Sequence, residues 1–224
     1  MGFLCIIDII ANLRGDFVED NKYEPKNDES QAPKQDKNGF SKAVLGYVRD
    51  LVYLLGAILI IFLIFFRVVV VSGPSMQNTL VDGDYLLLVG KPFYTQPARG
   101  DIIVAAKDSY ANGTPIVKRI IATEGQVVDI NFETGVVTVD GIALEEPYIK
   151  NLTRLSEGVQ FPLKVEPGCV FVMGDNRMNS KDSRDPIIGQ IDKREILGKA
   201  ILLFLPGTDG GNMDRDYSRI GVLP

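Results

Sequence analysis

The sequence contains no histidine and no tryptophan, and its only cysteines are Cys5 and Cys169. Without histidine, the chain cannot form the Ser–His or Cys–His pairs that activate many catalytic nucleophiles. Because it also lacks a Cys-x-x-Cys pair, we expect no zinc site, and nothing in the sequence indicates another metal or a cofactor. The two cysteines lie on opposite sides of a membrane-length apolar run. We therefore expect no disulfide, and we expect Cys169 to be a small core residue.

Basic residues are also few. The chain has 24 lysines and arginines against 29 aspartates and glutamates, which gives a formal net charge of −5. A nucleic-acid partner would require a basic face on the protein. We therefore expect no binding to nucleic acid.

One long segment has no charge at all, from residue 51 to residue 66. A membrane span needs about 20 residues, and Arg49 and Arg67 at its ends can reach the headgroups. We expect a single transmembrane helix over residues 43–67; a buried core helix is the alternative. Lysine and arginine are more frequent before the run than after it, which places the N-terminus in the cytoplasm.

The two ends of the chain have little core-forming character. Residues 1–42 are expected to be a cytoplasmic tail. Within it, 1–13 are either a short amphipathic surface helix or a frayed terminus, and 19–38 have the polar composition of a disordered tether. Residues 206–224 are rich in glycine and aspartate and are expected to be a loose C-terminal tail.

Residues 68–205 have the pattern of an extracytoplasmic all-β domain, because short apolar runs alternate there with turn residues. The Asp140-Gly141 pair is typical of a two-residue hairpin. We expect a mainly β fold, a barrel or a sandwich, preceded by one transmembrane helix. The expected strands are 85–89, 102–106, 116–122, 127–130, 136–139, 170–173 and 200–205.

Ser75 and Lys118 are the candidate catalytic residues. Ser75 lies in the segment Ser72-Gly73-Pro74-Ser75-Met76, where glycine and proline favour a tight turn that can present a hydroxyl; a plain turn is the alternative. Without histidine, lysine is the known substitute base for serine. On a strand, Lys118 shares a face with Ile116 and Ile120, and burial there would lower its pKa towards neutral; a lysine that reaches out from a strand edge is the alternative.

A third candidate element follows the expected strand 170–173. Residues 174–184, GDNRMNSKDSR, gather polar and charged groups of both signs. Such a run could supply the hydroxyl and carboxylate groups that orient a lysine amine, as the third member of a triad orients its base. The alternative is a solvated loop.

Three blocks of the sequence resemble the successive boxes of bacterial type I signal peptidases. They are SGPSMQNTL with GDYLLL, RGDIIV leading to VKRIIATEGQ, and GDNRMNSKDSR, and the resemblance covers about residues 66–205. It implies a membrane-anchored β-rich catalytic domain with Ser75 as nucleophile and Lys118 as base. It also implies that Ser180 holds the lysine amine, and that Arg119, Asp175, Asp182 and Arg184 support the site.

The chain departs from this family pattern at two positions. Asn78 stands where the family usually has proline, which affects the turn more than the chemistry. Gly73 stands where some members place an oxyanion-hole serine. Stabilisation of an oxyanion must then depend on the Ser75 amide, and another backbone group is a candidate second donor.

The resemblance implies an endopeptidase in the bacterial cell membrane that removes signal peptides from exported preproteins. Its partners would be preproteins with small residues before the cleavage site, together with membrane lipid, and we expect a monomer. Two other functions are weighed. One is a self-cleaving Ser–Lys protease of the repressor type. The other is a non-catalytic membrane-tethered β-domain, in which Ser75 and Lys118 would be remote from each other.

Overall fold

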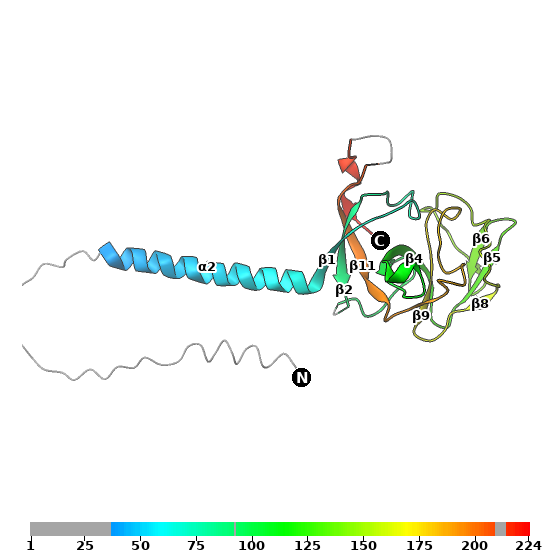
Figure 1. Ribbon diagram of the computed structural model, residues 1–224, viewed down its shortest axis with the longest axis horizontal. Helices are drawn as coiled ribbons and strands as arrows, with labels where there is room; N and C mark the ends of the chain where they lie inside the picture. The colour runs from blue at the N-terminus through cyan, green and yellow to red at the C-terminus, as the bar shows by residue number, and fades with distance from the viewer. Residues whose placement is uncertain (1–36, 92, 209–213) are drawn as a thin grey trace, which may run out of the picture. The chain divides into compact units, whose positions relative to one another are not determined.

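The computed structural model describes residues 37–91, 93–208 and 214–224. One long helix is followed by a mainly β domain, as Figure 1 shows, so the expected fold class is confirmed. Cys5, the interpretation of residues 1–13 and most of the expected tether lie outside the described residues. The elements are α2 (Lys37–Phe65), β1 (Phe66–Val70), β2 (Tyr85–Gly90), β3 (Ile102–Ala105), η1 (Ala111–Gly113), β4 (Ile116–Thr123), β5 (Val127–Asn131), β6 (Val136–Val139), β7 (Ile142–Ala143), β8 (Leu163–Lys164), β9 (Cys169–Met173), β10 (Ile191–Asp192), β11 (Ile196–Leu205), η2 (Tyr217–Arg219) and β12 (Gly221–Val222).

Helix α2 contains the stretch Ala43–Leu63, 21 residues with a mean hydropathy of 2.0, which is long and apolar enough to cross a membrane. This stretch begins at residue 43, where the expected span begins, but the helix that contains it has other ends than the expected span. The helix begins at Lys37, inside the expected tail, and it ends at Phe65. Phe66 and Arg67 belong to β1, which pairs antiparallel with β2 from Phe66 opposite Val89. A run of β-branched valines favours this ladder over a further turn of helix.

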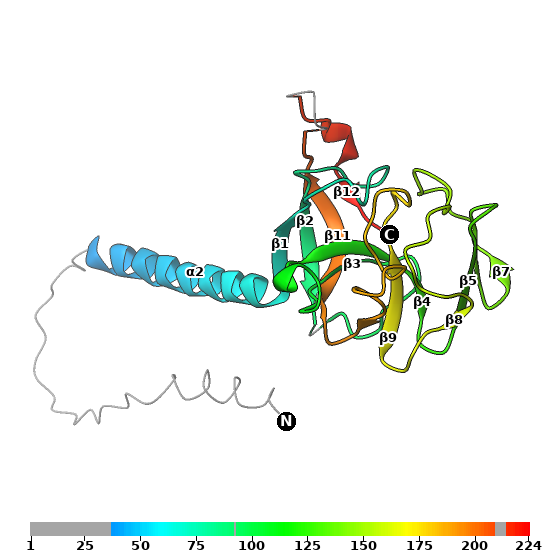
Figure 2. The same cartoon turned by 45° about the vertical axis from the view of Figure 1, so that its right-hand side comes forward.

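Two antiparallel sheets make up the β domain. The large sheet has the order β1-β2-β11-β3-β4-β9-β10, with β12 added to β11, and the small sheet has the order β7-β6-β5-β8. Figures 1 and 2 both show β1, β2 and β11 side by side and the small sheet at the far end of the domain. All seven expected strands are present, and β11 begins four residues before its expected start at 200. The Asp140-Gly141 hairpin joins β6 to β7, with positive φ at both residues, as expected.

Strand β4 lies at the centre of the packing because it is buried on both faces. Val117, Ile120 and Ile121 enter three different apolar clusters. The first cluster also contains Met76 and Leu80, both 0% exposed, from the segment that carries Ser75. The core therefore fixes both the strand of Lys118 and the segment of Ser75.

The expectation of a loose tail is wrong for residues 214–224. Strand β12 pairs with Leu202 and Leu203 of β11, and Leu223 packs against the first apolar cluster. The composition of the segment does not reveal this order, because the order comes from contacts with residues far away in sequence. Cys169 is half-buried beside the second cluster, and burial raises the pKa of its thiol.

Candidate active site

Ser75 lies in a turn whose two ends are tied together. The N–H of Val71 donates to the carbonyl of Asp84 at 2.8 Å, and the N–H of Gly83 donates back to the carbonyl of Val71 at 2.9 Å. Between them, the N–H of Leu80 donates to the carbonyl of Met76 at 2.8 Å. The buried side chains of Met76 and Leu80 anchor this turn, so the Ser75 side chain starts from a fixed backbone.

Lys118 projects from the middle of β4, opposite Ile103 of β3, and is 4% exposed. Its Nζ lies 2.8 Å from Ser75 Oγ and donates to the carbonyl of Val117 at 2.9 Å. The distance to Ser75 falls within the hydrogen-bond reach that a nucleophile and its base require. Two residues 43 positions apart in sequence are thus in direct contact.

Burial lowers the pKa of Lys118 from 10.5 to about 8. The charges of Asp182 and Asp175 act against this shift, and the charge of Arg184 acts with it. Arg119, the next residue along the strand, turns its guanidinium towards Asp175. The amine therefore loses its proton at a pH only slightly above neutral, and not near pH 10.5.

Arg119 and Asp175 form a buried bidentate ion pair beside the site. Arg119 Nε donates to Asp175 Oδ1 at 2.9 Å and Nη2 donates to Oδ2 at 2.7 Å, with side chains 3% and 0% exposed. Thr79 also donates to Asp175 Oδ2, and the Tyr148 ring lies 4.1 Å from the guanidinium carbon. The pair joins β4 to the segment that follows β9 and to the Ser75 turn.

Asp182 and Arg184 form a second buried pair, with both side chains 0% exposed. Arg184 donates from Nε and Nη2 to the two carboxylate oxygens, and Asp182 accepts from the N–H of Gly174 at 3.0 Å. Arg184 Nη1 also donates to the carbonyl of Arg177 at 2.9 Å. The solvated-loop alternative for residues 174–184 is therefore wrong, since only 178, 179 and 181 are exposed.

Ser180 does not make the expected hydrogen bond to Lys118. Its Oγ is buried and has no hydrogen-bond partner in the described part of the chain. Ser180 lines the groove that also contains Ser75 and Lys118. The Lys118 amine donates instead to Ser75 Oγ and to the carbonyl of Val117. Gly174 brings Ser180 close to the nucleophile: a Cβ there would overlap Ser180 Oγ and lie 2.5 Å from the Ser75 carbonyl oxygen.

Asn176 supports the Ser75 turn and was not identified from the sequence. Asn176 donates from its N–H to the Ser75 carbonyl at 3.0 Å and from Nδ2 to the Pro74 carbonyl at 3.1 Å. It lies inside the polar run, but nothing in its type distinguishes it from its neighbours there. Asn78 adopts φ 94°, which a proline ring forbids, so this turn differs from one with proline at that position.

Ser75 and Lys118 meet in a groove of about 370 Å³, walled by residues 69–75, 114–118 and 179–181. Another hollow, of about 430 Å³, is lined by residues that include Lys107, Cys169 and Glu195, and it contains neither Ser75 nor Lys118. The groove that contains both the candidate nucleophile and the candidate base is therefore the candidate active site.

Residues 44–205 match the family model described as signal peptidase, peptidase S26. The chain belongs to this family. It is therefore a peptidase, and the resemblance stated from the sequence blocks is confirmed. The family match ends at the last residue of β11, so residues 206–224 lie outside it.

Similar proteins include a probable signal peptidase I-1 from Synechocystis sp., 36% identical over 153 residues that make up 64% of this chain and 73% of that protein. Signal peptidase I from Bacillus licheniformis is 34% identical over 149 residues, 63% of this chain and 77% of that protein. Signal peptidase I U from Bacillus subtilis is 32% identical over 166 residues, 71% of this chain and 86% of that protein. A crystal structure of a signal peptidase I from Enterococcus faecalis aligns with 47% of this chain and 97% of its own, at 28% identity and a TM-score of 0.39.

Proposed function

We propose that the chain is a type I signal peptidase, a serine endopeptidase that removes N-terminal signal peptides from exported preproteins. The observation that carries the proposal is the 2.8 Å contact between Ser75 Oγ and the buried Lys118 amine in an open groove. Membership of the signal peptidase family supplies the substrate class.

In the first half of the reaction, Ser75 Oγ attacks the carbonyl carbon on the N-terminal side of the scissile bond. Neutral Lys118 takes the hydroxyl proton during the attack and passes a proton to the leaving amine. The C–N bond breaks, and the signal peptide stays on Ser75 as an ester. In the second half, Lys118 takes a proton from water, which attacks the ester carbonyl. The bond to Ser75 Oγ breaks, Lys118 returns the proton to that oxygen, and the signal peptide is released with a free carboxylate.

The oxyanion requires a donor beside Ser75. Residue 73 is glycine and has no hydroxyl, and its N–H already donates to Asp82 Oδ1 at 2.7 Å. We assign the role to the Ser75 N–H, which a turn held by Met76 and Leu80 keeps at a fixed position. A single well-placed backbone donor of this kind lowers the barrier without reorganising during the reaction.

The supporting residues divide into two groups. We assign to Ser180 the task of accepting from the Lys118 amine after Ser75 has been esterified, because Ser180 lines the same groove and its buried Oγ has no hydrogen-bond partner among the described residues. Arg119 with Asp175, and Asp182 with Arg184, hold the 174–184 segment against the Ser75 turn. The charges of Asp175, Asp182 and Arg184 also set how far burial can lower the pKa of Lys118.

The substrate and location follow from the same proposal. Valines at 69–71 and 117 line the groove, which suits small side chains before the cleavage site better than large ones. We propose one span within residues 37–65, an N-terminus in the cytoplasm, a catalytic domain from residue 66 onwards outside it, and a monomer that contacts membrane lipid. The membrane-length stretch Ala43–Leu63 within α2, with β1 beginning at Phe66, supports this division of the chain.

The test is cleavage of a preprotein by purified full-length enzyme in detergent. Ser75→Ala and Lys118→Met should each abolish cleavage, and the double variant should be no worse than either, because the two residues act as a unit. Ser109→Ala and Lys107→Met are matched controls outside the groove and should cleave like the wild type. Substantial cleavage by Lys118→Met at neutral pH would show that another group is the base.

Of the two other functions, the non-catalytic β-domain required Ser75 and Lys118 to be remote, which their contact contradicts. A self-cleaving repressor-type protease is disfavoured by the membrane-length apolar stretch in α2. A signal peptidase should cleave a separate preprotein at a rate that does not depend on cleavage of its own chain, whereas a self-cleaving protease should cleave only itself.

A further inference from the structure

The C-terminal segment beyond the family match contacts the turn that carries Ser75. Pro206 and Gly207 are buried, and the N–H of Gly207 donates to Asp84 Oδ1 at 2.6 Å. A Cβ on Gly207 would overlap the carbonyl oxygen of Asp82 and lie 2.7 Å from the N–H nitrogen of Asp84. Only glycine lets the chain cross so closely over the end of the Ser75 turn.

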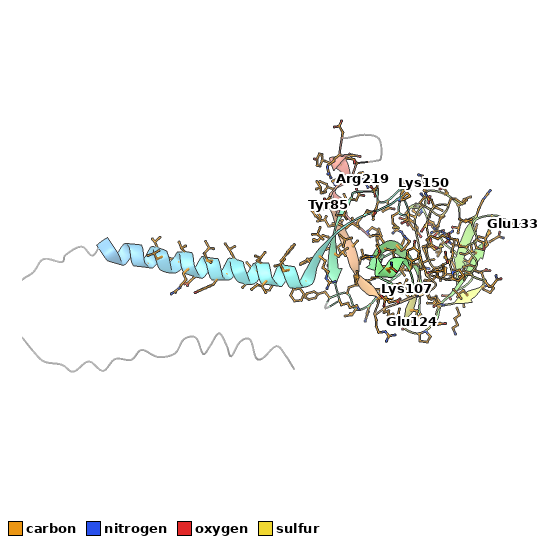
Figure 3. The ribbon with its side chains drawn as sticks, viewed as in Figure 1. Tyr85, Lys107, Glu124, Glu133, Lys150 and Arg219 are labelled. Carbon is orange, nitrogen blue, oxygen red and sulfur yellow. The ribbon has the colours of Figure 1, made fainter. Side chains whose placement is uncertain are left out.

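Arg219, on the same segment, makes the stronger contact. Its Nη1 donates to Asp84 Oδ1 at 3.0 Å and its Nη2 to Oδ2 at 2.7 Å, and Nη2 also reaches the Thr79 carbonyl at 3.4 Å. Asp84 is 0% exposed and the Arg219 side chain is 25% exposed. Figure 3 labels Arg219 on this segment, which is red in Figure 1. Asp84 in turn accepts from the N–H of Val81 at 2.8 Å.

These contacts complete the support of the nucleophile from two sides. On one side, Asn176 binds the Ser75 carbonyl and Asp175 binds the Thr79 hydroxyl. On the other side, Arg219 binds the Thr79 carbonyl and the carboxylate of Asp84, whose own carbonyl ties the turn to Val71. Thr79 is therefore held by its hydroxyl from within the family domain and by its carbonyl from the C-terminal segment.

We infer that Arg219 is a positioning residue for the reaction: it holds the 76–84 segment so that Ser75 Oγ stays in contact with the Lys118 amine. This inference rests on the proposed function, in which Ser75 is the nucleophile. Arg219 does not line the groove, so it would act on the position of Ser75 Oγ and not by contact with the substrate. A displacement of about 1 Å at such a site can lower the rate about a hundredfold.

The experiment compares full-length Arg219→Gln with Arg215→Gln. Arg215 lies on the same segment but donates to the Pro206 carbonyl and not to the Ser75 turn. We expect kcat for preprotein cleavage to fall about tenfold or more in Arg219→Gln, with KM within about twofold of wild type, and Arg215→Gln to keep both constants. The folded fraction, measured by thermal unfolding, normalises each kcat.

Arg219→Gln leaves the buried Asp84 carboxylate without its cation, which alone could prevent folding. The double variant Asp84→Asn/Arg219→Gln removes that charge, so it should recover stability while its kcat stays low. Recovery of kcat together with stability would overturn the inference, and so would a raised KM with unchanged kcat. If the wild type and Arg215→Gln both fail to cleave, the proposed function fails and the inference fails with it. If the wild type is active and Arg219→Gln has the same kcat, only the inference is overturned.

Discussion

Lys118 is deeply buried because its strand has no solvent face. A strand with period two would bury Ile116 and Ile120 on the face of Lys118, as the sequence indicates, and leave the other face to polar residues. In the structure Val117 and Ile121 are buried as well, and every residue from 117 to 122 is below the surface. The strand of the lysine is therefore covered on both faces, and burial is the main cause of the low pKa of Lys118.

Activity should rise with pH through the pKa of Lys118, about 8, because only the neutral amine accepts a proton. Ile120→Asn would admit water beside the amine, raise that pKa towards 10.5 and shift the rising limb of kcat/KM to higher pH. The exposed Ile142→Asn is the control, with an unshifted limb. An unshifted limb in folded Ile120→Asn would show that burial on this face does not set the pKa.

The same burial destabilises the folded protein at neutral pH. The pKa of Lys118 is lower in the folded state, about 8, than the 10.5 expected when unfolded, so the unfolded chain holds this proton more tightly. The penalty is fully present below pH 8 and disappears as the pH rises past 10.5, and it amounts to at most about 3 kcal/mol. Lys118→Met should therefore raise the free energy of unfolding at neutral pH by about 1–3 kcal/mol, and less near pH 10.5. Urea unfolding at the two pH values measures this, and an equal effect at both would contradict it.

At the scale of elements, the strands were predictable because apolar runs and turn residues alternate, and the Asp140-Gly141 turn has only one comfortable geometry. β1 was not, because its valines continue the apolar run and only pairing with β2 makes them a strand. The contact of Arg219 with Asp84 was not predictable either, since it joins residues 135 positions apart. The polar run pointed to Ser180 through family resemblance, but a motif does not determine which acceptor a lysine amine selects.

The junction between β9 and the polar segment depends on close packing at Gly174. Gly174→Ala would push its Cβ into the Ser180 hydroxyl and the Ser75 carbonyl, so the nucleophile or Ser180 must move. We expect kcat to fall about tenfold or more, with a loss of about 1–3 kcal/mol in stability. Gly221→Ala has open space around its Cβ and serves as the control. Wild-type kcat in folded Gly174→Ala would show that this close approach does not matter for the reaction.

For the whole molecule, the short connection between span and sheet limits where the reaction can occur. β1 begins at the residue after α2, and Ser75 follows within ten residues, at most roughly 35 Å of extended chain. Val68 and Val70 on β1 are 54% and 47% exposed, and Val70 lines the groove. If α2 is the proposed span, Ser75 is therefore tethered within reach of the membrane surface, where we expect the cleavage sites of signal peptides to emerge.

The proposed orientation can be measured directly. In sealed vesicles with the cytoplasmic face outside, an added protease should digest the N-terminal tail and leave residues 66–224 protected, because they lie in the lumen. Detergent should remove the protection, which is the control for an intrinsically resistant fold. Digestion of the β domain in intact vesicles would contradict both the orientation and the assigned function.

Strand β11 lies between β2 and β3, although it is the last long strand in the chain. The serine follows β1 and precedes β2, and the lysine is on β4, so the two belong to separate antiparallel pairs, and within the sheet β11 is the strand that joins these pairs. During synthesis the chain emerges from its N-terminus, and domains fold as units once their parts are present. We therefore expect the nucleophile and its base to be held together only after residues 196–205 have left the ribosome. On this expectation, the nascent polypeptide carries no assembled active site while α2, the proposed span, is inserted into the membrane, and it becomes a peptidase only after β11 has been made.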